Sequence, residues 1–199
     1  MPTLTIFAGI NGAGKSTLYR FQDSLKQPHL GTRVCPDEIL QDFNGDWKNH
    51  ADVYKSGKLT LEKLTKCFKL KQTFNWELTL ISYFTIQNIK LAKSLGYTIS
   101  LNFIGVDNVE QSLKRIAERV KKGGHGIDKE TVQHRFDHQF DNLPEALTLV
   151  DKAVFYDNKH TMKIVGVYCD KTLNFFNKNI PWVKNVVAKI KKHNETPEQ

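Results

Sequence analysis

Strand-like apolar runs and longer mixed segments alternate along this chain, and their order predicts its secondary structure. Short runs rich in β-branched and aromatic residues predict strands over residues 3–8, 32–35, 73–79, 97–106, 153–156 and 163–168. Longer segments that mix apolar and charged residues predict helices over residues 15–26, 37–43, 50–71, 82–95, 109–122, 128–140, 143–150 and 181–192. Such an alternation is typical of an α/β fold, so we expect a largely parallel central sheet flanked by helices on both faces.

A glycine-rich break separates two charged helices in the second half of the chain. Residues 121–126 read Lys-Lys-Gly-Gly-His-Gly, which is typical of a flexible turn. The sequence shows no internal repeat and no interdomain linker, and 199 residues are enough for one sizeable core. We therefore predict a single domain over residues 1–199, with a helical, arginine-bearing flap around residues 109–140.

The composition is that of a globular protein, with 40% hydrophobic and 25% charged residues. No apolar run reaches the ~18 residues of a membrane helix, and residues 1–3 lead directly into the first predicted strand without a signal-peptide pattern. The three cysteines, Cys35, Cys67 and Cys169, are not spaced as metal ligands. We therefore expect a cytoplasmic protein with no disulfide framework, no zinc site and no membrane partner.

The net charge of +8 suits a negatively charged partner, either nucleic acid or a phosphorylated small molecule. Much of the excess lies over residues 55–71 and 184–192, at spacings typical of solvated helix faces. The sequence shows neither alternating basic and aromatic residues nor a recognition-helix pattern. We therefore expect that nucleic acid is not the main partner, while a polynucleotide acceptor stays open as an alternative.

Residues 9–17 match the phosphate-loop motif G-x-x-x-x-G-K-[ST] and lie between a predicted strand and a predicted helix. The glycines allow the backbone to wrap around a phosphate chain, and the helix N-terminus adds partial positive charge. The motif predicts a P-loop NTPase fold that binds ATP and Mg²⁺, with Lys15 at the β- and γ-phosphates and the Ser16 hydroxyl on Mg²⁺. The nucleotide-binding residues that it predicts are Gly9, Asn11, Gly12, Ala13, Gly14, Lys15, Ser16 and Thr17.

Asp37 follows a short predicted strand, and Pro36 suits the first turn of the next helix. The carboxyl end of a strand is where open parallel sheets bind ligands. A carboxylate there can accept the proton of an attacking hydroxyl. The alternative is that Asp37 and Glu38 only complement the helix dipole, and the sequence alone leaves the two interpretations even.

Three arginines surround the glycine-rich break. Arg115 and Arg119 are four residues apart and share one helix face, whereas Arg135 lies on the helix after the break. Arginines on two helices joined by a glycine-rich turn indicate a flap that closes over a triphosphate and stabilises charge on the transferring phosphoryl group. The alternative is that they are ordinary exposed arginines on amphipathic helices.

Other polar residues lie near the ends of predicted strands. Glu77 lies in an apolar run, where a buried carboxylate needs a partner such as a substrate hydroxyl or a Mg²⁺-bound water, although alternation also permits a solvent-facing position. Asp157 and Asn158 either line the nucleotide pocket or form a turn. Asp107 is either an acid near Mg²⁺ or a helix cap, and we interpret His125 as a loop residue rather than a base.

Together these clusters resemble the zeta-toxin family of phosphate-loop kinases over roughly residues 3–158. The most specific segment is Arg-x3-Arg-Val-x2-Gly-Gly-His over residues 115–125. The phosphate loop and six further segments contribute, namely residues 36–39, 77–80, 96–104, 135–136, 142–143 and 157–158. The family implies ATP-dependent phosphorylation of a hydroxyl, for some members on UDP-N-acetylglucosamine. It also implies a possible protein partner, a small antitoxin that blocks the nucleotide site.

The resemblance assigns roles to individual residues. The implied catalytic residues are Lys15, Asp37, Arg119 and Arg135, the implied acceptor contacts are Glu77 and Thr79, and the implied Mg²⁺ ligand is Ser16. In this assignment Asp37 is the general base, and the two arginines clamp the γ-phosphate.

The sequence departs from the family pattern at two places. Ile10 replaces a proline of the phosphate loop, and residues 77–81 read Glu-Leu-Thr-Leu-Ile, without two hydroxyls of the family's run. We therefore predict a small-molecule kinase whose acceptor is UDP-N-acetylglucosamine or another hydroxyl compound. The alternatives are a polynucleotide or other metabolite kinase and a non-catalytic nucleotide-binding module. A GTPase is disfavoured because residues 158–161 lack the aspartate of N-K-x-D.

Overall fold

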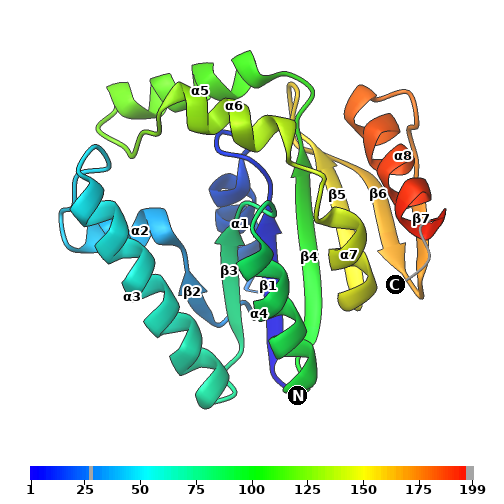
Figure 1. The fold of residues 1–199 in the computed structure, drawn as a ribbon, viewed down its shortest axis with the longest axis horizontal. Helices are drawn as coiled ribbons and strands as arrows, with labels where there is room; N and C mark the ends of the chain where they lie inside the picture. Colours follow the sequence, from blue (N-terminus) through cyan, green and yellow to red (C-terminus); the bar gives the residue numbers. More distant parts are fainter. Residues whose placement is uncertain (27–28, 196–199) are drawn as a thin grey trace.

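The computed structural model describes residues 1–26 and 29–195, and within these ranges seven strands form one mixed sheet with helices on both faces (Figure 1). The strands are β1 (Thr3–Ala8), β2 (Thr32–Val34), β3 (Phe74–Leu78), β4 (Thr98–Gly105), β5 (Lys152–Asp157), β6 (Lys163–Cys169) and β7 (Thr172–Phe175). The helices are α1 (Lys15–Ser24), α2 (Pro36–Asp42), α3 (His50–Lys69), α4 (Tyr83–Ser94), α5 (Val109–Lys121), α6 (Lys129–Asp137), α7 (Leu143–Leu149) and α8 (Pro181–Glu195).

The order of the strands is β2-β3-β1-β4-β5-β6-β7. The first five pair in parallel, and β6 and β7 add an antiparallel extension. The largely parallel α/β fold that the sequence predicts is therefore confirmed. Because β1 lies between β3 and β4, the loop after β1 opens at the middle of the carboxyl edge, where parallel sheets bind ligands.

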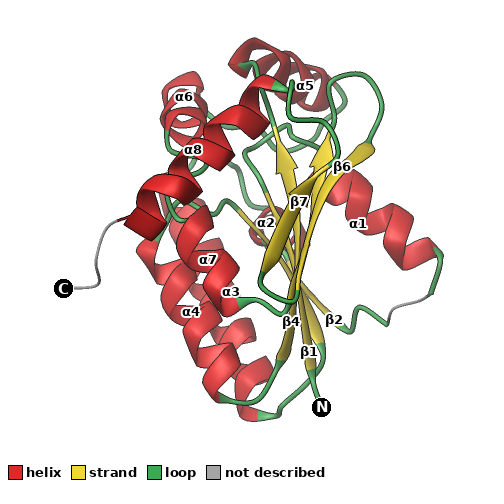
Figure 2. Ribbon diagram, turned by 90° about the vertical axis from the view of Figure 1, so that its right-hand side faces the viewer, coloured by secondary structure: helices red, strands yellow, loops and turns green. Residues whose placement is uncertain are grey.

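Helices cover the two faces of the sheet unequally. In Figure 2, α3, α4, α7 and α8 lie on one side of the strands and α1 lies on the other. The larger core includes Phe74, Phe103 and Phe155, and a smaller core between the sheet and α1 includes Phe7 and Leu18. None of the helices in residues 1–26 and 29–195 is long and apolar enough to cross a membrane.

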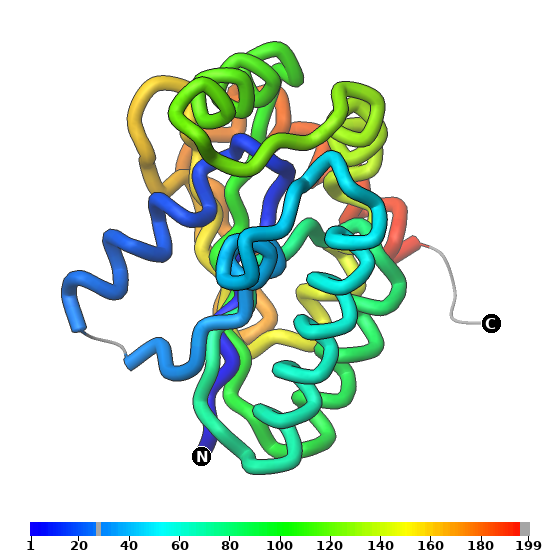
Figure 3. The backbone as a smooth tube through the Cα atoms, turned by 90° about the vertical axis from the view of Figure 1, so that its left-hand side faces the viewer, coloured from blue at the N-terminus to red at the C-terminus, as the bar shows by residue number. Residues whose placement is uncertain are grey.

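The helices α5 and α6 lie across the carboxyl ends of the parallel strands (Figure 3). Each begins at a side-chain cap, because Asn108 accepts a hydrogen bond from the Glu110 N–H and Asp128 accepts one from the Thr131 N–H, both at 2.7 Å. The glycine-rich segment joins the two helices. The caps fix where each helix starts and so place the arginines of both helices above the phosphate loop.

The strand β7 is the one strand within the described residues that the sequence analysis did not predict. It follows a tight turn in which Asp170 and Lys171 both have positive φ, and it pairs with β6. Of its four residues only Phe175 is buried. A four-residue edge strand with one buried side chain carries too little apolar periodicity to be recognised.

Candidate active site

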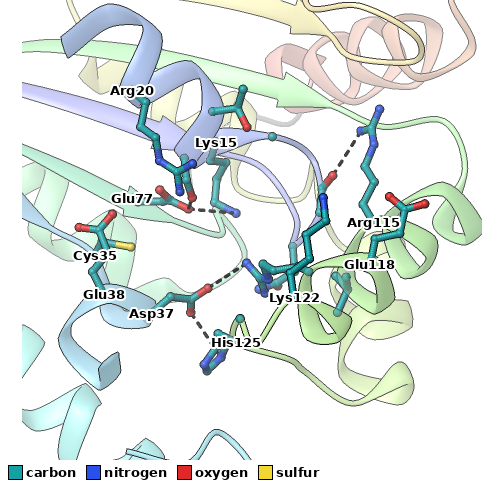
Figure 4. A pocket seen from close by; sticks show the side chains of 18 of the residues that line it. Lys15, Arg20, Cys35, Asp37, Glu38, Glu77, Arg115, Glu118, Lys122 and His125 are labelled. Atoms are coloured by element: carbon teal, nitrogen blue, oxygen red, sulfur yellow. Dashed lines mark hydrogen bonds and ion pairs between the residues drawn. The ribbon is translucent and has the colours of Figure 1, made fainter. Parts of the chain in front are cut away.

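A cavity of about 590 Å³ lies at the carboxyl edge of the sheet, between the phosphate loop, α2 and α5 (Figure 4). It brings together residues from distant parts of the chain. The predicted site residues that line it are Asn11, Gly12, Gly14, Lys15, Ser16, Thr17, Asp37, Glu77, Arg119 and Asn158. Gly9, Ala13, Thr79, Arg135 and Asp157 lie outside this lining.

The phosphate loop requires glycine at two positions that approach other backbone closely. Gly12 has φ +76°, and a Cβ there would lie 2.6 Å from the Ser112 carbonyl oxygen of α5. Gly9 has φ +143°, and a Cβ there would lie 2.6 Å from the Ile104 carbonyl oxygen. Both the backbone conformation and the space exclude a side chain, so the loop can press against β4 and α5.

Two basic side chains hold the first half of the loop. Lys15 Nζ donates to the Ile10 carbonyl oxygen at 3.1 Å, and Arg135 Nη1 donates to Asn11 Oδ1 at 2.6 Å. Burial lowers the pKa of Lys15 and of Arg135, while nearby carboxylates act in the opposite direction. Arg135 of α6 therefore reaches the phosphate loop through Asn11, although it lies outside the cavity lining.

Two further side chains hold the second half of the loop. Arg115 of α5 donates to the carbonyl oxygens of Gly12 and Asn158, at 3.3 and 2.5 Å. Asn158, after β5, donates to the Ala13 carbonyl oxygen at 2.8 Å. Arg115 and Asn158 thus brace the loop by its backbone, and the guanidinium of Arg115 is bound to carbonyl groups.

Glu77 points into the interior towards the phosphate loop, with 7% of its surface exposed. Ser16 Oγ donates to its Oε1 at 3.0 Å, and Lys15 Nζ lies 4.0 Å from the same oxygen. Arg33 of β2 forms a salt bridge with its Oε2. The alternative of a solvent-facing glutamate is therefore wrong, because the partners of this carboxylate lie inside the fold.

Arg33 connects the two acidic segments, and the sequence analysis gave it no role. Its guanidinium donates to both carboxylate oxygens of Glu38 at 3.0–3.2 Å and to Asn75 Oδ1 at 3.1 Å. It also lies over the Tyr19 ring, 3.8 Å from the ring centre. The only signal in the sequence is a charged residue inside a short predicted strand, which is consistent with an ion pair.

Asp37, in the first turn of α2, faces the side chains of Arg119, near the end of α5, and His125, in the loop after it. Its Oδ2 lies 3.4 Å from Arg119 Nη1, and its Oδ1 lies 3.5 Å from His125 Nε2. Figure 4 shows His125 beside Asp37, with a dashed line that joins the two side chains. Burial lowers the pKa of His125, and the Asp37 charge opposes that shift. His125 belongs to a loop, as expected, but it also lines the cavity.

Arg119 and His125 have nitrogen atoms that are buried but unused. Among the side chains of residues 1–26 and 29–195, Arg119 Nε and Nη2 and His125 Nδ1 are buried without a hydrogen-bond partner. Buried donors normally have partners. The unused donors of Arg119, which lines the cavity, therefore suit an anion bound there.

Asp107 and Asp157 lie at the same edge of the sheet but serve a different contact. Asp107 Oδ1 accepts the backbone N–H of Trp182 at 2.7 Å, and Asp157 Oδ1 accepts the indole Nε1–H of Trp182 at 2.9 Å. Burial raises the pKa of Asp107. The Trp182 ring packs so closely on Gly105 that a Cβ there would lie 2.3 Å from it. The structure thus places Asp157, a predicted nucleotide ligand, in the anchor of α8, and Asp107 caps α8 rather than the next helix.

The donor set of the cavity suits a nucleotide triphosphate with Mg²⁺. Mg²⁺ prefers oxygen ligands, and the Ser16 hydroxyl and the Glu77 carboxylate meet at the start of α1. The N-terminus of α1 begins with Lys15, so its free N–H groups point at the same region. These residues therefore fit the ATP and the Mg²⁺ that the phosphate-loop motif predicts.

Comparison with known proteins adds a family and a fold. The family model described as "Zeta toxin" matches residues 1–178. An uncharacterised protein of Haemophilus influenzae (strain ATCC 51907 / DSM 11121 / KW20 / Rd) is 35% identical over 130 residues, which is 65% of this chain and 89% of that protein.

Two solved complexes share the fold. A crystal structure of the AvrRxo1-ORF1:-ORF2 complex superposes with a TM-score of 0.73 at 15% identity and covers 95% of this chain, which spans 64% of the length of that one. The same complex with ATP gives a TM-score of 0.69 at 14% identity, over 100% of this chain and 66% of that chain. The PezAT toxin–antitoxin system of Streptococcus pneumoniae gives 0.62 at 18% identity, over 98% and 86%.

Proposed function

The chain belongs to the zeta-toxin family, and we propose that it is an ATP-dependent kinase that transfers a phosphoryl group to a hydroxyl of a small molecule. The observation that carries this proposal is a single cavity that holds a phosphate loop on one side and Asp37 on the other. Between them lie buried, unused donors of Arg119. A phosphate site, a carboxylate base and an arginine in one cavity are the parts that phosphoryl transfer requires.

On the nucleotide side, the phosphate loop would hold the ATP phosphates with its backbone N–H groups. Lys15 would move from the Ile10 carbonyl, 3.1 Å away, to the β- and γ-phosphates. Ser16 and Glu77 would hold Mg²⁺, whose charge offsets that of the phosphates. Asn158 would keep the loop in shape through the Ala13 carbonyl.

On the acceptor side, Asp37 would accept the proton of the acceptor hydroxyl as the hydroxyl oxygen bonds to the γ-phosphorus and the bond from that phosphorus to the ADP oxygen breaks. Arg119 would bind the equatorial oxygens with donors that lack a partner within the described part of the chain. Arg135, which donates a hydrogen bond to Asn11, would add positive charge beside the phosphate loop.

We place a UDP-activated amino sugar such as UDP-N-acetylglucosamine first among the acceptors, because membership of the family implies it for some members. Residues 77–81, which lack two hydroxyls of the family's run, leave another hydroxyl compound as the alternative. Of the two acceptor contacts that the family implies, Glu77 lines the cavity and Thr79 lies outside the lining. Both oxygens of Glu77 are already engaged by Ser16 and Arg33.

The proposal includes ATP as phosphoryl donor, an antitoxin protein as partner and a cytoplasmic location. The partner is supported by family membership and by the PezAT system, a toxin–antitoxin system of the same fold.

The cytoplasmic location is supported by the three free cysteines found among the described residues, of which Cys35 and Cys67 are buried. Burial raises the pKa of Cys35 to about 12, so its thiol stays protonated beside the cavity.

The test is a product assay with purified protein, ATP and Mg²⁺, against UDP-sugars, free nucleotides and 5′-hydroxyl RNA. Each product is checked by mass for one added phosphate. We expect phosphorylated UDP-N-acetylglucosamine, and we expect Lys15→Ala to abolish it because the loop loses its charge on the transferring group. Transfer to another small molecule would replace the acceptor. ATP binding without transfer to any acceptor would contradict the proposed kinase.

A further inference from the structure

His125 lies between the proposed base, Asp37, and the indole ring of Trp47. Its Nε2 is 3.5 Å from Asp37 Oδ1, and its ring centre is 6.2 Å from that of Trp47, with 59° between the planes. We propose that His125 is a positioning residue that holds the Asp37 carboxylate in the orientation needed to accept a proton. This inference rests on the proposed kinase function and adds a residue to it.

The hydrogen-bonding capacity of Asp37 fixes the tautomer of this histidine. An ionised carboxylate only accepts hydrogen bonds, so a neutral imidazole next to it must carry its proton on Nε2. The other nitrogen, Nδ1, is buried and has no partner among the residues that the structure describes. Among the residues that the structure describes, Asp37 is therefore the one polar partner of the His125 ring.

The glycines on either side of His125 bring its loop close to two other side chains. A Cβ at Gly124 would lie 2.7 Å from Arg119 Cγ, and a Cβ at Gly126 would lie 2.4 Å from Trp47 Cζ2. Both glycines allow the chain to pass close to these side chains, and His125 stands between them. The side chain of His125 is 13% exposed, so its position is set by packing.

The two oxygens of Asp37 are approached by donors from one segment of the chain. Arg119, near the end of α5, lies 3.4 Å from Oδ2, and His125, in the loop after α5, lies 3.5 Å from Oδ1. Hydrogen bonds in catalytic sites are often this long without substrate and tighten in the reacting complex. Without the donor on Oδ1, the carboxylate can turn towards Arg119 and leave the acceptor hydroxyl.

The test compares two amide substitutions that place a donor at different ring positions. In His125→Gln the amide nitrogen stands where Nε2 does, and in His125→Asn it stands where Nδ1 does. We expect His125→Asn to lower kcat about 10- to 100-fold, as misplaced catalytic groups do, and His125→Gln to keep most of the wild-type kcat. The KM for ATP and the unfolding midpoint should change little in either variant. His193→Gln, at an exposed position of α8, is the matched control.

Equal losses in both variants, or no loss in His125→Asn, would overturn the proposed hydrogen bond. A rise in the KM for ATP with unchanged kcat would overturn it too, because it would assign His125 to nucleotide binding.

A second measurement is independent of the kinase reaction. Long-range ¹H–¹⁵N spectra of the imidazoles, with the His125 signal identified by its absence in His125→Gln, should show an Nε2–H tautomer that shifts in Asp37→Asn. An Nδ1–H tautomer would overturn the inference. If the wild type phosphorylates no acceptor while the Nε2–H tautomer is found, the proposed function fails and the His125–Asp37 contact stands.

Discussion

Two pairs of acids lie at the carboxyl edge of the same sheet, and their surroundings differ. Asp37 and Glu77, near the ends of β2 and β3, line an open cavity beside the phosphate loop. Asp107 and Asp157, near the ends of β4 and β5, are bonded to Trp182 at the start of α8. The end of a parallel strand therefore supplies acids to both regions, and the element that covers them decides whether they face a cavity or a helix.

The two pairs also differ in the charge of their partners. Glu77 and Asp37 are close to the guanidinium groups of Arg33 and Arg119. Asp107 and Asp157 accept neutral N–H groups of Trp182. Guanidinium groups beside carboxylates leave cationic donors next to the phosphate loop, whereas a neutral donor is sufficient to anchor a helix.

When one acid of each pair is substituted, the largest effect that we expect is on catalysis. Asp37→Asn should lower kcat by about 10²- to 10⁴-fold, because an amide cannot accept the hydroxyl proton. Asp157→Asn, the same change in the other pair, should leave kcat and the KM for ATP near the wild-type values. Steady-state kinetics on the acceptor identified by mass checks both. A similar loss in the two variants would show that the pairs do not differ in function.

The next largest effect should come from Glu77→Gln, which tests whether an acid that lines the cavity also stabilises the fold. The salt bridge to Arg33 joins side chains that are 9% and 12% exposed. Removing one charge of a buried pair should lower the free energy of unfolding by about 3 kcal/mol. Denaturant unfolding measures it, and the double variant Arg33→Met/Glu77→Gln should regain part of the loss. Additive losses would contradict the coupling.

A smaller effect should follow when Asp157, in the pair of acids bonded to Trp182, loses its hydrogen-bond donor. Trp182→Phe removes the indole N–H and leaves Asp157 Oδ1 without that partner, which should lower the free energy of unfolding by about 1–3 kcal/mol. The kcat of the folded fraction should stay unchanged, since Trp182 lies outside the cavity lining. Urea unfolding and kinetics at low temperature give the two values. A change in kcat without a change in stability would mean that α8 acts on the cavity.

The smallest effect should be a difference in pH dependence at His125, which faces Asp37, Arg119 and Arg135. Burial lowers its pKa in the folded state below the ~6.5 of an unfolded chain. Below about pH 6.5 the unfolded state therefore binds a proton that the folded state does not, so this contribution to stability is lost as pH falls. His125→Gln should lose less stability than wild type between pH 7.5 and 5.5 in urea unfolding. An equal loss would mean that burial of His125 has no energetic weight.

The sequence predicted the parts of the site that depend on local pattern. The phosphate loop needs only a strand, a glycine turn and a helix, and the strand order of the fold then brings Asp37 and Glu77 to the same edge. Arg33 and His125 were not given their places, because their partners are set by packing between elements far apart in the chain.

One pair of neighbours shows where local pattern fails. Asp157 and Asn158 are adjacent at the end of β5, yet Asn158 bonds to the phosphate loop and Asp157 bonds to α8. Asp157 is the last residue of β5, whereas Asn158 belongs to the loop that follows. The sequence gives both residues at the strand end, and only the elements packed around that end assign them to different contacts.

Four successive residues of the phosphate loop, over residues 10–13, already have an acceptor bonded to a side chain from another position, namely Lys15, Arg135, Arg115 and Asn158. Ordering a residue's backbone costs roughly 1–2 kcal/mol of conformational entropy. Here that ordering occurs when the chain folds, so a nucleotide meets a loop that is already shaped. We therefore expect the affinity for ATP to depend on the stability of α5, of α6 and of the segment after β5, so that mutations far from any phosphate should weaken it.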